Sequence, residues 1–245
     1  MWRNSVASHR CGFIGAYGKV CVSQPVAIDE LEVPIVAWDA YEWVQNLLKR
    51  YHYDDESRQM LQLGKGTVSK ILEEVLPLAV YARQRKDFKN VYLHYFASSS
   101  QSFDAEFRTG ESELVERTEV TIAINGFEEQ IRRETIERHG WSPGFGLNEY
   151  AGSVRNREIP EPENRLHGQE EAVAKLKSLV ESAYAKKVRN IDKYLGTSLV
   201  IGVDCFVLNS RAEFQEVISP VVGTKTPFEA VNIVDTNGRF YHCHK

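Results

Sequence analysis

Two acidic residues in strand-like segments, Asp104 and Glu119, are the first candidates for chemistry in this sequence. Successive side chains of a β-strand point to opposite faces, so Glu119 and Thr121 are expected on one face and Val120 and Ile122 on the other. Asp104 is expected on the same side as Glu119. Two carboxylates that converge at strand ends can hold a hard divalent cation such as Mg²⁺. Water that loses a proton beside such a cation is a nucleophile suited to phosphodiester bonds.

The same two carboxylates also fit a simpler interpretation, in which both are solvated on the exposed face of a polar hairpin. Tertiary geometry separates the alternatives. A shared cation requires the carboxylates of Asp104 and Glu119 to lie about 4–6 Å apart, given ligand distances of roughly 2.0–2.6 Å. Side chains that faced opposite sides of the sheet would exclude the metal site.

The elements that must position these residues follow from hydrophobic periodicity and turn signals. Helices are expected over 38–51, 54–63, 67–87, 127–140, 169–196 and 210–219. Strands are expected over 90–99, 102–108, 113–124, 197–208, 228–235 and 239–245. Residues 141–168, rich in glycine and proline and without periodicity, are expected to form a long loop. This order predicts an α/β (α+β) fold with a central mixed β-sheet flanked by helices.

Several single residues mark where these elements begin, bend or end. Asp39 and Thr67 are placed to cap the starts of two helices. Pro77 is expected to bend or interrupt the helix that contains it. Asn125 and Gly126 together are expected to end the third strand sharply.

The charge and composition of the chain limit its partners and location. The formal net charge is −4 and the pI is near 6.0, whereas a protein that grips nucleic acid by bulk electrostatics is normally basic. Any nucleic-acid contact must therefore come from local patches or through a metal ion. No window approaches the roughly 18 apolar residues of a membrane span. No secretory signal is evident and the four cysteines are scattered, so reduced thiols and a cytoplasmic location are expected.

Three common catalytic or cofactor motifs are absent from the sequence. It contains no G-x-S-x-G, no H-E-x-x-H and no G-x-G-x-x-G pattern. Serine hydrolase, zinc protease and dinucleotide-binding functions therefore lack support.

The segments "SFDAEF" (102–107) and "EVT" (119–121) together resemble the motifs of the PD-(D/E)XK nuclease superfamily. In that superfamily an aspartate begins the second core strand, and the D/E-x-K pattern lies on the third. Asp104 matches the aspartate and Glu119 matches the acidic residue of the second motif. Thr121 stands where the superfamily has lysine.

The resemblance implies a restriction-endonuclease-like fold. Its core, one helix, three antiparallel strands, a helix and a further strand, would cover about residues 67–208. That core would belong to a single domain, 1–245, with an N-terminal extension over 1–36 and C-terminal strands over 228–245.

The resemblance also implies roles for individual residues. Asp104 and Glu119 would bind Mg²⁺ or Mn²⁺, and Glu74, on the first core helix, would add a third acidic ligand. Thr121 would position the attacking water, but a threonine cannot supply the positive charge of the missing lysine. Some members of the superfamily take that charge from a neighbouring helix, and we name Lys187 as the candidate catalytic lysine. The alternatives are Lys186 and Lys193 near Lys187, and Arg132 and Gln130 on the helix expected over 127–140.

The function implied is that of a magnesium-dependent nuclease, a hydrolase that binds DNA and cleaves its phosphodiester bonds. Many nucleases of this fold form homodimers to cut both strands, so a homodimer is a second expected partner. The alternative is an inactive protein of the same fold that binds nucleic acid or protein, for instance in a phage or mobile element. The missing lysine and the acidic pI favour this alternative. A nuclease directed at RNA is a third interpretation.

Overall fold

The computed structural model describes residues 25–97, 101–110, 113–142, 151–153, 156–158, 161 and 168–245. Its strands form one seven-stranded sheet, in the order β1-β2-β3-β4-β7-β8-β9, and a separate pair, β5-β6. The seven are β1 (Ile35–Val36), β2 (Val91–Tyr95), β3 (Ala105–Thr109), β4 (Glu113–Ile122), β7 (Ser198–Val203), β8 (Val231–Asp235) and β9 (Tyr241–His244). The separate pair comprises β5 (Ala151–Ser153) and β6 (Asn156–Glu158).

Apart from α1, which falls in the expected N-terminal extension and was not predicted, the α-helices in the described part of the chain lie within the expected helical segments or within two residues of them. They are α1 (Ile28–Leu31), α2 (Ala40–Lys49), α3 (Asp55–Leu63), α4 (Thr67–Lys70), α5 (Leu76–Gln84), α6 (Gly126–His139), α7 (Gln169–Val188) and α8 (Arg211–Ile218). None of the helices among the described residues is long and apolar enough to cross a membrane.

The sheet is mixed, as predicted. β2, β3 and β4 pair antiparallel, whereas β4, β7 and β8 pair parallel. Parallel neighbours require a crossover, and here α6 and α7 connect β4 to β7 while α8 connects β7 to β8. β1 and β9 add antiparallel edges at the two ends.

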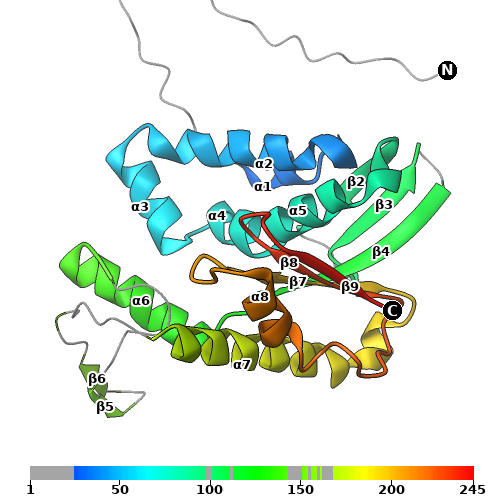
Figure 1. Ribbon diagram of the computed structural model, residues 1–245. Coiled ribbons are helices and arrows are strands. Elements are labelled where there is room, and N and C mark those ends of the chain that lie inside the picture. Colours follow the sequence, from blue (N-terminus) through cyan, green and yellow to red (C-terminus); the bar gives the residue numbers. More distant parts are fainter. Residues whose placement is uncertain are drawn as a thin grey trace, which may run out of the picture.

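Helices cover both faces of the sheet (Figure 1). α2, α4 and α5 lie on one face, and α7 and α8 lie on the other. Each layer has its own buried cluster: Val120 and Val200 belong to the cluster beneath α5, and Leu199 and Ile201 to the cluster beneath α7. Because β7 is buried on both faces, its sequence is nearly all apolar.

The long helix expected from residue 67 is divided in three. Gly66, rather than Thr67, is the cap residue, and Thr67 is already helical. A π-helical turn, η3 (Ile71–Val75), separates α4 from α5. Pro77 lies in the first turn of α5 and has no backbone N–H to donate to the preceding turn. The wider π-turn just before it accommodates that missing bond, so Pro77 interrupts the helix as expected.

Pro77 also explains a glycine in the middle of the sheet. A Cβ on Gly202 of β7 would lie 2.7 Å from Cγ of Pro77. α5 therefore packs onto β7 at a distance that only glycine permits. This contact holds α5, and with it the adjoining π-turn η3 that carries Glu73 and Glu74, against the central strands.

The capping prediction for Asp39 is wrong, as is that for Thr67, whereas Asn125 has a capping role that was not predicted. Asp39 precedes α2, but its side chain makes no capping hydrogen bond. Asn125 does more than end a strand, because its side chain accepts hydrogen bonds from the backbone N–H groups of Phe127 and Glu128 and so caps α6. At the other end of α6, Gly140 takes the left-handed conformation and stops the helix, as expected.

Short strands were missed at two places. β1 pairs with β2, so residues 35 and 36 lie in the sheet although sequence analysis assigns them to the N-terminal extension. β5 and β6 form a small antiparallel pair within 141–168, the segment expected to be a loop without structure. Much of that segment, including 143–150, lies outside the described residues. A strand of two or three residues is too short to show alternation.

Candidate functional site

Glu119 and Thr121 lie on the face of β4 that looks toward α7. Their partners on β7 are Leu199 and Ile201, which both belong to the buried cluster under α7. Glu119 is only 5% exposed. The interpretation of this carboxylate as a solvated residue on a hairpin surface is therefore wrong.

Asp104 lies immediately before β3, where the last β3–β4 pair is Ala105 with Thr118. Its Oδ2 atom accepts a hydrogen bond from the backbone N–H of Val120 at 2.8 Å. The carboxylate thus takes a position that a backbone carbonyl fills in an uninterrupted ladder, and it satisfies a strand N–H that would otherwise lack a partner. This bond holds Asp104 beside Glu119, the residue that precedes Val120.

Lys187, near the end of α7, reaches back to the same place. Its ammonium group donates a hydrogen bond to Oε1 of Glu119. The two side chains are 15% and 6% exposed, so this ion pair is largely shielded from water. The Lys187 ammonium also lies 5.3 Å from the ring centroid of Tyr194, within cation–π range. The crossover helix α7 therefore places Lys187 in contact with Glu119, the acidic residue of the "EVT" segment.

The pKa of Asp104 reports how close these charges are. Burial, the negative charge of Glu119 and, to a smaller extent, that of Glu74 raise the pKa of Asp104, which is about 6. The hydrogen bond from Val120 and the charge of Lys187 act in the opposite direction. Two carboxylates in a site of low dielectric resist ionising together unless a cation compensates them.

Lys187 compensates for part of that charge. Burial by itself would lower the pKa of Lys187, but the hydrogen bond and the negative charge of Glu119 raise it above the usual value. Lys187 is therefore charged at neutral pH. Once Asp104 ionises, one ammonium faces two carboxylates, and the site carries an excess of negative charge that a further cation would relieve.

Glu74 approaches from the opposite face of the sheet. Its Oε1 atom accepts a hydrogen bond from Lys70 at 2.8 Å, and its Oε2 atom accepts one from the hydroxyl of Tyr95. Burial and this hydrogen bond to Glu74 raise the pKa of Tyr95, so its hydroxyl stays protonated and donates. Tyr95 pairs with Ala105, the residue after Asp104. Through Tyr95 and Ala105, Glu74 therefore lies close to Asp104.

The other candidates for the missing lysine lie in different environments. Arg132 pairs with Glu129, and Gln130 donates to Glu134 at 3.0 Å. The ammonium of Lys193 lies over the ring of Tyr194, 5.1 Å from its centroid. Of the five residues proposed from the sequence, Lys187 is the one whose contact with Glu119 is found in the described structure.

A divalent cation, which the resemblance implies, can be tested against these donors. No group of three or more His, Cys, Asp or Glu among the described residues could hold a metal ion. Asp104, Glu119 and Glu74 therefore do not form a ready-made three-carboxylate site. Mg²⁺ often takes only one or two carboxylates and keeps several waters, so Asp104 and Glu119 suit it in number and type of donor, and its binding there stays a prediction. The role of Glu74 as a third ligand stays a prediction.

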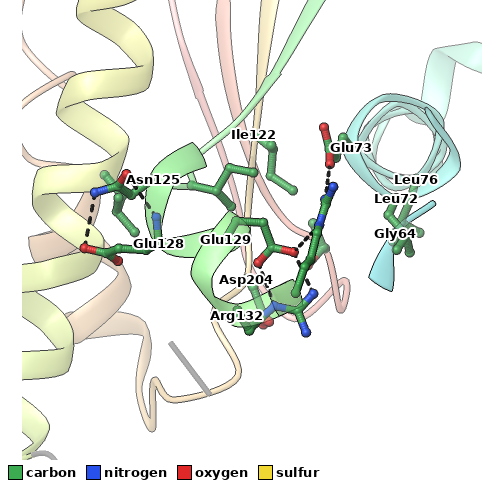
Figure 2. A pocket seen from close by; sticks show the side chains of 14 residues that line it. Gly64, Leu72, Glu73, Leu76, Ile122, Asn125, Glu128, Glu129, Arg132 and Asp204 are labelled. Atoms are coloured by element: carbon green, nitrogen blue, oxygen red, sulfur yellow. Dashed lines mark hydrogen bonds and ion pairs between the residues drawn. The ribbon is translucent and has the colours of Figure 1, made fainter. Parts of the chain in front are cut away.

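A cleft of about 370 Å³ opens at the carboxyl end of β4, where Ile122 and Asn125 line it (Figure 2). In open α/β sheets this edge is the usual place for a ligand. Its lining includes the apolar residues Leu72, Leu76, Ile122 and Leu179 and the charged residues Glu73, Glu128, Glu129, Arg132 and Arg133.

Four charged side chains of the cleft are engaged with one another: Glu73, Glu129, Arg132 and Arg133 (Figure 2). Arg133 donates to Glu73 of η3 and to Glu129 of α6, each at 3.0 Å. Burial alone would raise the pKa of Glu129, but the hydrogen bonds from Arg132 and Arg133 hold that pKa below its usual range. These contacts tie α6 to the turn that carries Glu74. The ion pairs that line the cleft therefore help to hold Glu74 in position.

Sequence analysis missed two contacts of the site, those of Lys70 and Tyr95 with Glu74. Lys70 lies one helical turn before Glu74, a spacing at which an ion pair forms on a helix, so its signal was present. Tyr95 gave no such signal, because its partner lies 21 residues away in another element.

Comparison with known proteins yields no match: no family model, no curated protein and no solved structure matches this chain. The candidate site therefore rests on the positions and charges of its own residues.

Proposed function

We propose that this protein is a divalent-metal-dependent nuclease of the PD-(D/E)XK type that hydrolyses phosphodiester bonds of DNA. The observation that carries the proposal is the buried contact between Lys187 and Glu119 beside Asp104. It brings two carboxylates and one lysine to one point, which is the side-chain set of the superfamily motif with the lysine supplied by another element.

The order of elements supports the restriction-endonuclease-like fold. A helical segment containing Glu74 is followed by three antiparallel strands, β2, β3 and β4. After the crossover helices, β7 returns parallel to β4. Asp104 precedes the second of these strands and Glu119 lies on the third, as the motif requires.

The side chains would divide the work. Asp104 and Glu119 would hold Mg²⁺ or Mn²⁺, which supplies activation of water and neutralisation of phosphate charge. Lys187 holds the Glu119 carboxylate in place and adds a fixed positive charge near the scissile phosphate. Thr121 lies on the same face as Glu119, and its hydroxyl is suited to orient a water molecule by hydrogen bonding.

An inactive protein of the same fold that binds nucleic acid or protein is the second candidate. The observation that favours it is the same ion pair, because Lys187 already occupies one oxygen of Glu119 and Thr121 replaces the motif lysine. A buried pair of this kind also serves simply to hold α7 against β4.

One experiment separates the two candidates. The purified protein is incubated with single-stranded DNA, duplex DNA and single-stranded RNA, with Mg²⁺, with Mn²⁺ or with a chelator. The nuclease proposal expects metal-dependent cleavage of DNA that is lost in Glu119→Ala and in Asp104→Ala. Glu113→Ala is the matched control, since Glu113 is an exposed carboxylate at the start of the same strand. The RNA arm tests the third interpretation.

Metal binding is measured independently by titrating Mn²⁺ into wild type and into the Asp104→Ala/Glu119→Ala double variant. Equal and negligible heats in both proteins would end the metal-site proposal. Cleavage that persists in the folded Glu119→Ala variant would contradict the proposal that Glu119 is a metal ligand needed for cleavage. Sedimentation of the wild type tests the expected homodimer in the same preparation.

A further inference from the structure

A polar groove of about 560 Å³ lies on the hairpin strands, apart from the cleft of Figure 2. It is lined by His94, Phe96, Gln101, Phe103, Glu106, Arg108 and Arg117. Three of these residues form a single row across the sheet, because His94 pairs with Glu106 and Glu106 pairs with Arg117. A row of paired residues on one face makes a rigid floor.

The floor of the groove is positively charged. Glu106 is almost fully buried between two guanidinium groups, with Nε of Arg108 at 2.8 Å and Nε of Arg117 at 3.1 Å. Burial and the charge of Arg108 lower the pKa of His94. Two cations therefore face one anion and a neutral imidazole, and the groove carries a net positive charge.

The Glu106 carboxylate also fixes the orientation of the guanidinium groups of Arg108 and Arg117. It bonds Nε of both arginines, which fixes the plane of each group at its inner edge. The side chain of Arg117 remains 45% exposed. Outer guanidinium N–H groups held in this way suit an oxygen anion such as phosphate.

Aromatic rings form one wall of the same groove. Phe96 and Phe103 meet edge to face at 5.8 Å between ring centroids, and the guanidinium of Arg117 lies 5.1 Å from the centroid of Phe103. All three side chains keep part of their surface in contact with water. Phenyl rings beside an arginine offer a stacking surface of the kind that accepts unpaired bases.

The groove adjoins the candidate site. Arg117 precedes Glu119 by two residues on β4 and therefore shares its face, roughly 7 Å away along the strand. Glu106 stands in the same relation to Asp104 on the neighbouring segment. A chain molecule that lies across the groove would continue directly to Asp104 and Glu119.

We propose that this groove is a binding subsite for an unpaired stretch of nucleic acid, with a base against Phe103 and Phe96 and a phosphate at Arg117 and Arg108. The inference rests on the proposed function for the direction in which the strand continues. An unpaired strand fits better than a duplex because only unpaired bases expose their faces to phenyl rings. The net charge of −4 for the whole chain confines this attraction to the local patch.

Binding is tested without cleavage, in a chelator, by fluorescence anisotropy of labelled single-stranded DNA, single-stranded RNA and duplex DNA. The expected result is tighter binding of a single strand than of the duplex. Phe103→Ala should weaken binding of the single strand between about 5-fold and 100-fold. Arg117→Ala should weaken binding and reduce the slope of affinity against salt by about one. The DNA and RNA arms show which nucleic acid is preferred.

Matched controls test whether the groove itself is responsible. Phe206→Ala removes an exposed phenyl group outside the groove, and Arg211→Ala removes an exposed arginine on α8. Both should bind like wild type. Phe103→Leu keeps apolar packing but removes the ring face, so it should weaken binding even if Phe103→Ala unfolds.

The outcomes distinguish this inference from the nuclease proposal. Binding that depends on Phe103 and Arg117 in a protein without cleavage would support the subsite and contradict the nuclease. Metal-dependent cleavage with binding that is unchanged in Phe103→Leu and Arg117→Ala would overturn the subsite and leave the nuclease standing. Equal affinity for duplex and single strand, or absence of binding to all three probes, would also overturn the subsite.

Discussion

The ammonium group of Lys187 hydrogen-bonds the carboxylate of Glu119, 68 residues earlier in the chain, in a place that water hardly reaches. This contact joins the crossover helix α7 to the central strand β4. It supplies a positive charge on the face that Glu119 shares with Thr121, the residue that stands where the proposed motif has lysine. The predictions below ask what that contact and its neighbours do.

Moving the lysine from position 187 to position 121 is the sharpest test of whether Lys187 takes part in catalysis. Lys187→Ala should lower metal-dependent cleavage by about 100-fold or more, because a fixed charge near the reacting phosphate is lost. Adding Thr121→Lys to that variant should restore part of the rate, since residue 121 lies on the face of Glu119. Initial rates are measured on labelled DNA.

Two controls accompany the exchange. Lys186→Ala, on the adjacent position of the same helix, should cleave like wild type. Lys187→Gln keeps a donor for Glu119 but removes the charge, so a rate as high as wild type in this variant would show that Lys187 has only a structural role. Urea denaturation checks each variant, because removing one partner of a buried ion pair costs about 3–5 kcal/mol.

The raised pKa of Asp104 predicts how stability changes with pH. Its folded-state pKa is about 6, above the ordinary value of 3.8. A group whose pKa is raised on folding favours the folded state most when it is protonated. Its contribution is therefore complete below about pH 4 and is lost as pH rises through about 6, by at most about 3 kcal/mol.

Urea denaturation of wild type and Asp104→Asn, at several pH values between about 4 and 7, measures this contribution as a difference. The difference removes the opposite effect of carboxylates whose pKa is lowered, such as Glu106 and Glu129. The stability advantage of wild type should shrink as pH rises. Parallel curves would contradict the assigned environment of Asp104.

Glu74→Gln tests whether the carboxylate on η3 takes part in the site. Removing its charge should lower the pKa of Asp104, because Glu74 contributes to raising it. The pH at which the Asp104 contribution is lost should therefore fall. If Glu74 is also a ligand, the affinity for Mn²⁺ should drop about 10-fold or more, as measured by calorimetry.

Glu73→Gln is the control for this prediction. Glu73 is adjacent in sequence but pairs with Arg133 of α6. It should leave both the pKa of Asp104 and Mn²⁺ affinity unchanged. An unaltered Mn²⁺ affinity in Glu74→Gln would show that Glu74 is not a metal ligand and acts on Asp104 only through its charge.

Gly202→Ala tests the packing of Pro77 in α5 against β7. The added Cβ would lie 2.7 Å from Cγ of Pro77, and both the proline ring and the strand backbone are stiff. The free energy of unfolding should fall by about 1–3 kcal/mol. Gly126→Ala is the control, since a Cβ there meets nothing within 4 Å among the described atoms. Equal stability of both variants in urea denaturation would contradict this packing.

Much of the fold could be predicted from local signals. Apolar positions at helical spacing located α2, α3, α6, α7 and α8, and β-branched and aromatic runs located the longer strands. Those signals suffice because secondary structure of this length is decided largely by which face must be buried. The very short elements α1, β1, β5 and β6 were missed, and the π-turn η3 was not foreseen, because segments this short carry too little periodicity to predict them.

The sequence by itself determined that Glu119 and Thr121 share a face of β4 opposite Val120, because alternation is a property of the strand backbone. It also marked Asp104 and a small set of basic residues as candidates. Only the tertiary structure decided that Lys187, and none of its alternatives, meets Glu119, and that Asp104 bonds the backbone of Val120. The physical reason is that both contacts join segments brought together by strand pairing and by the docking of α7, and no spacing in the chain encodes them.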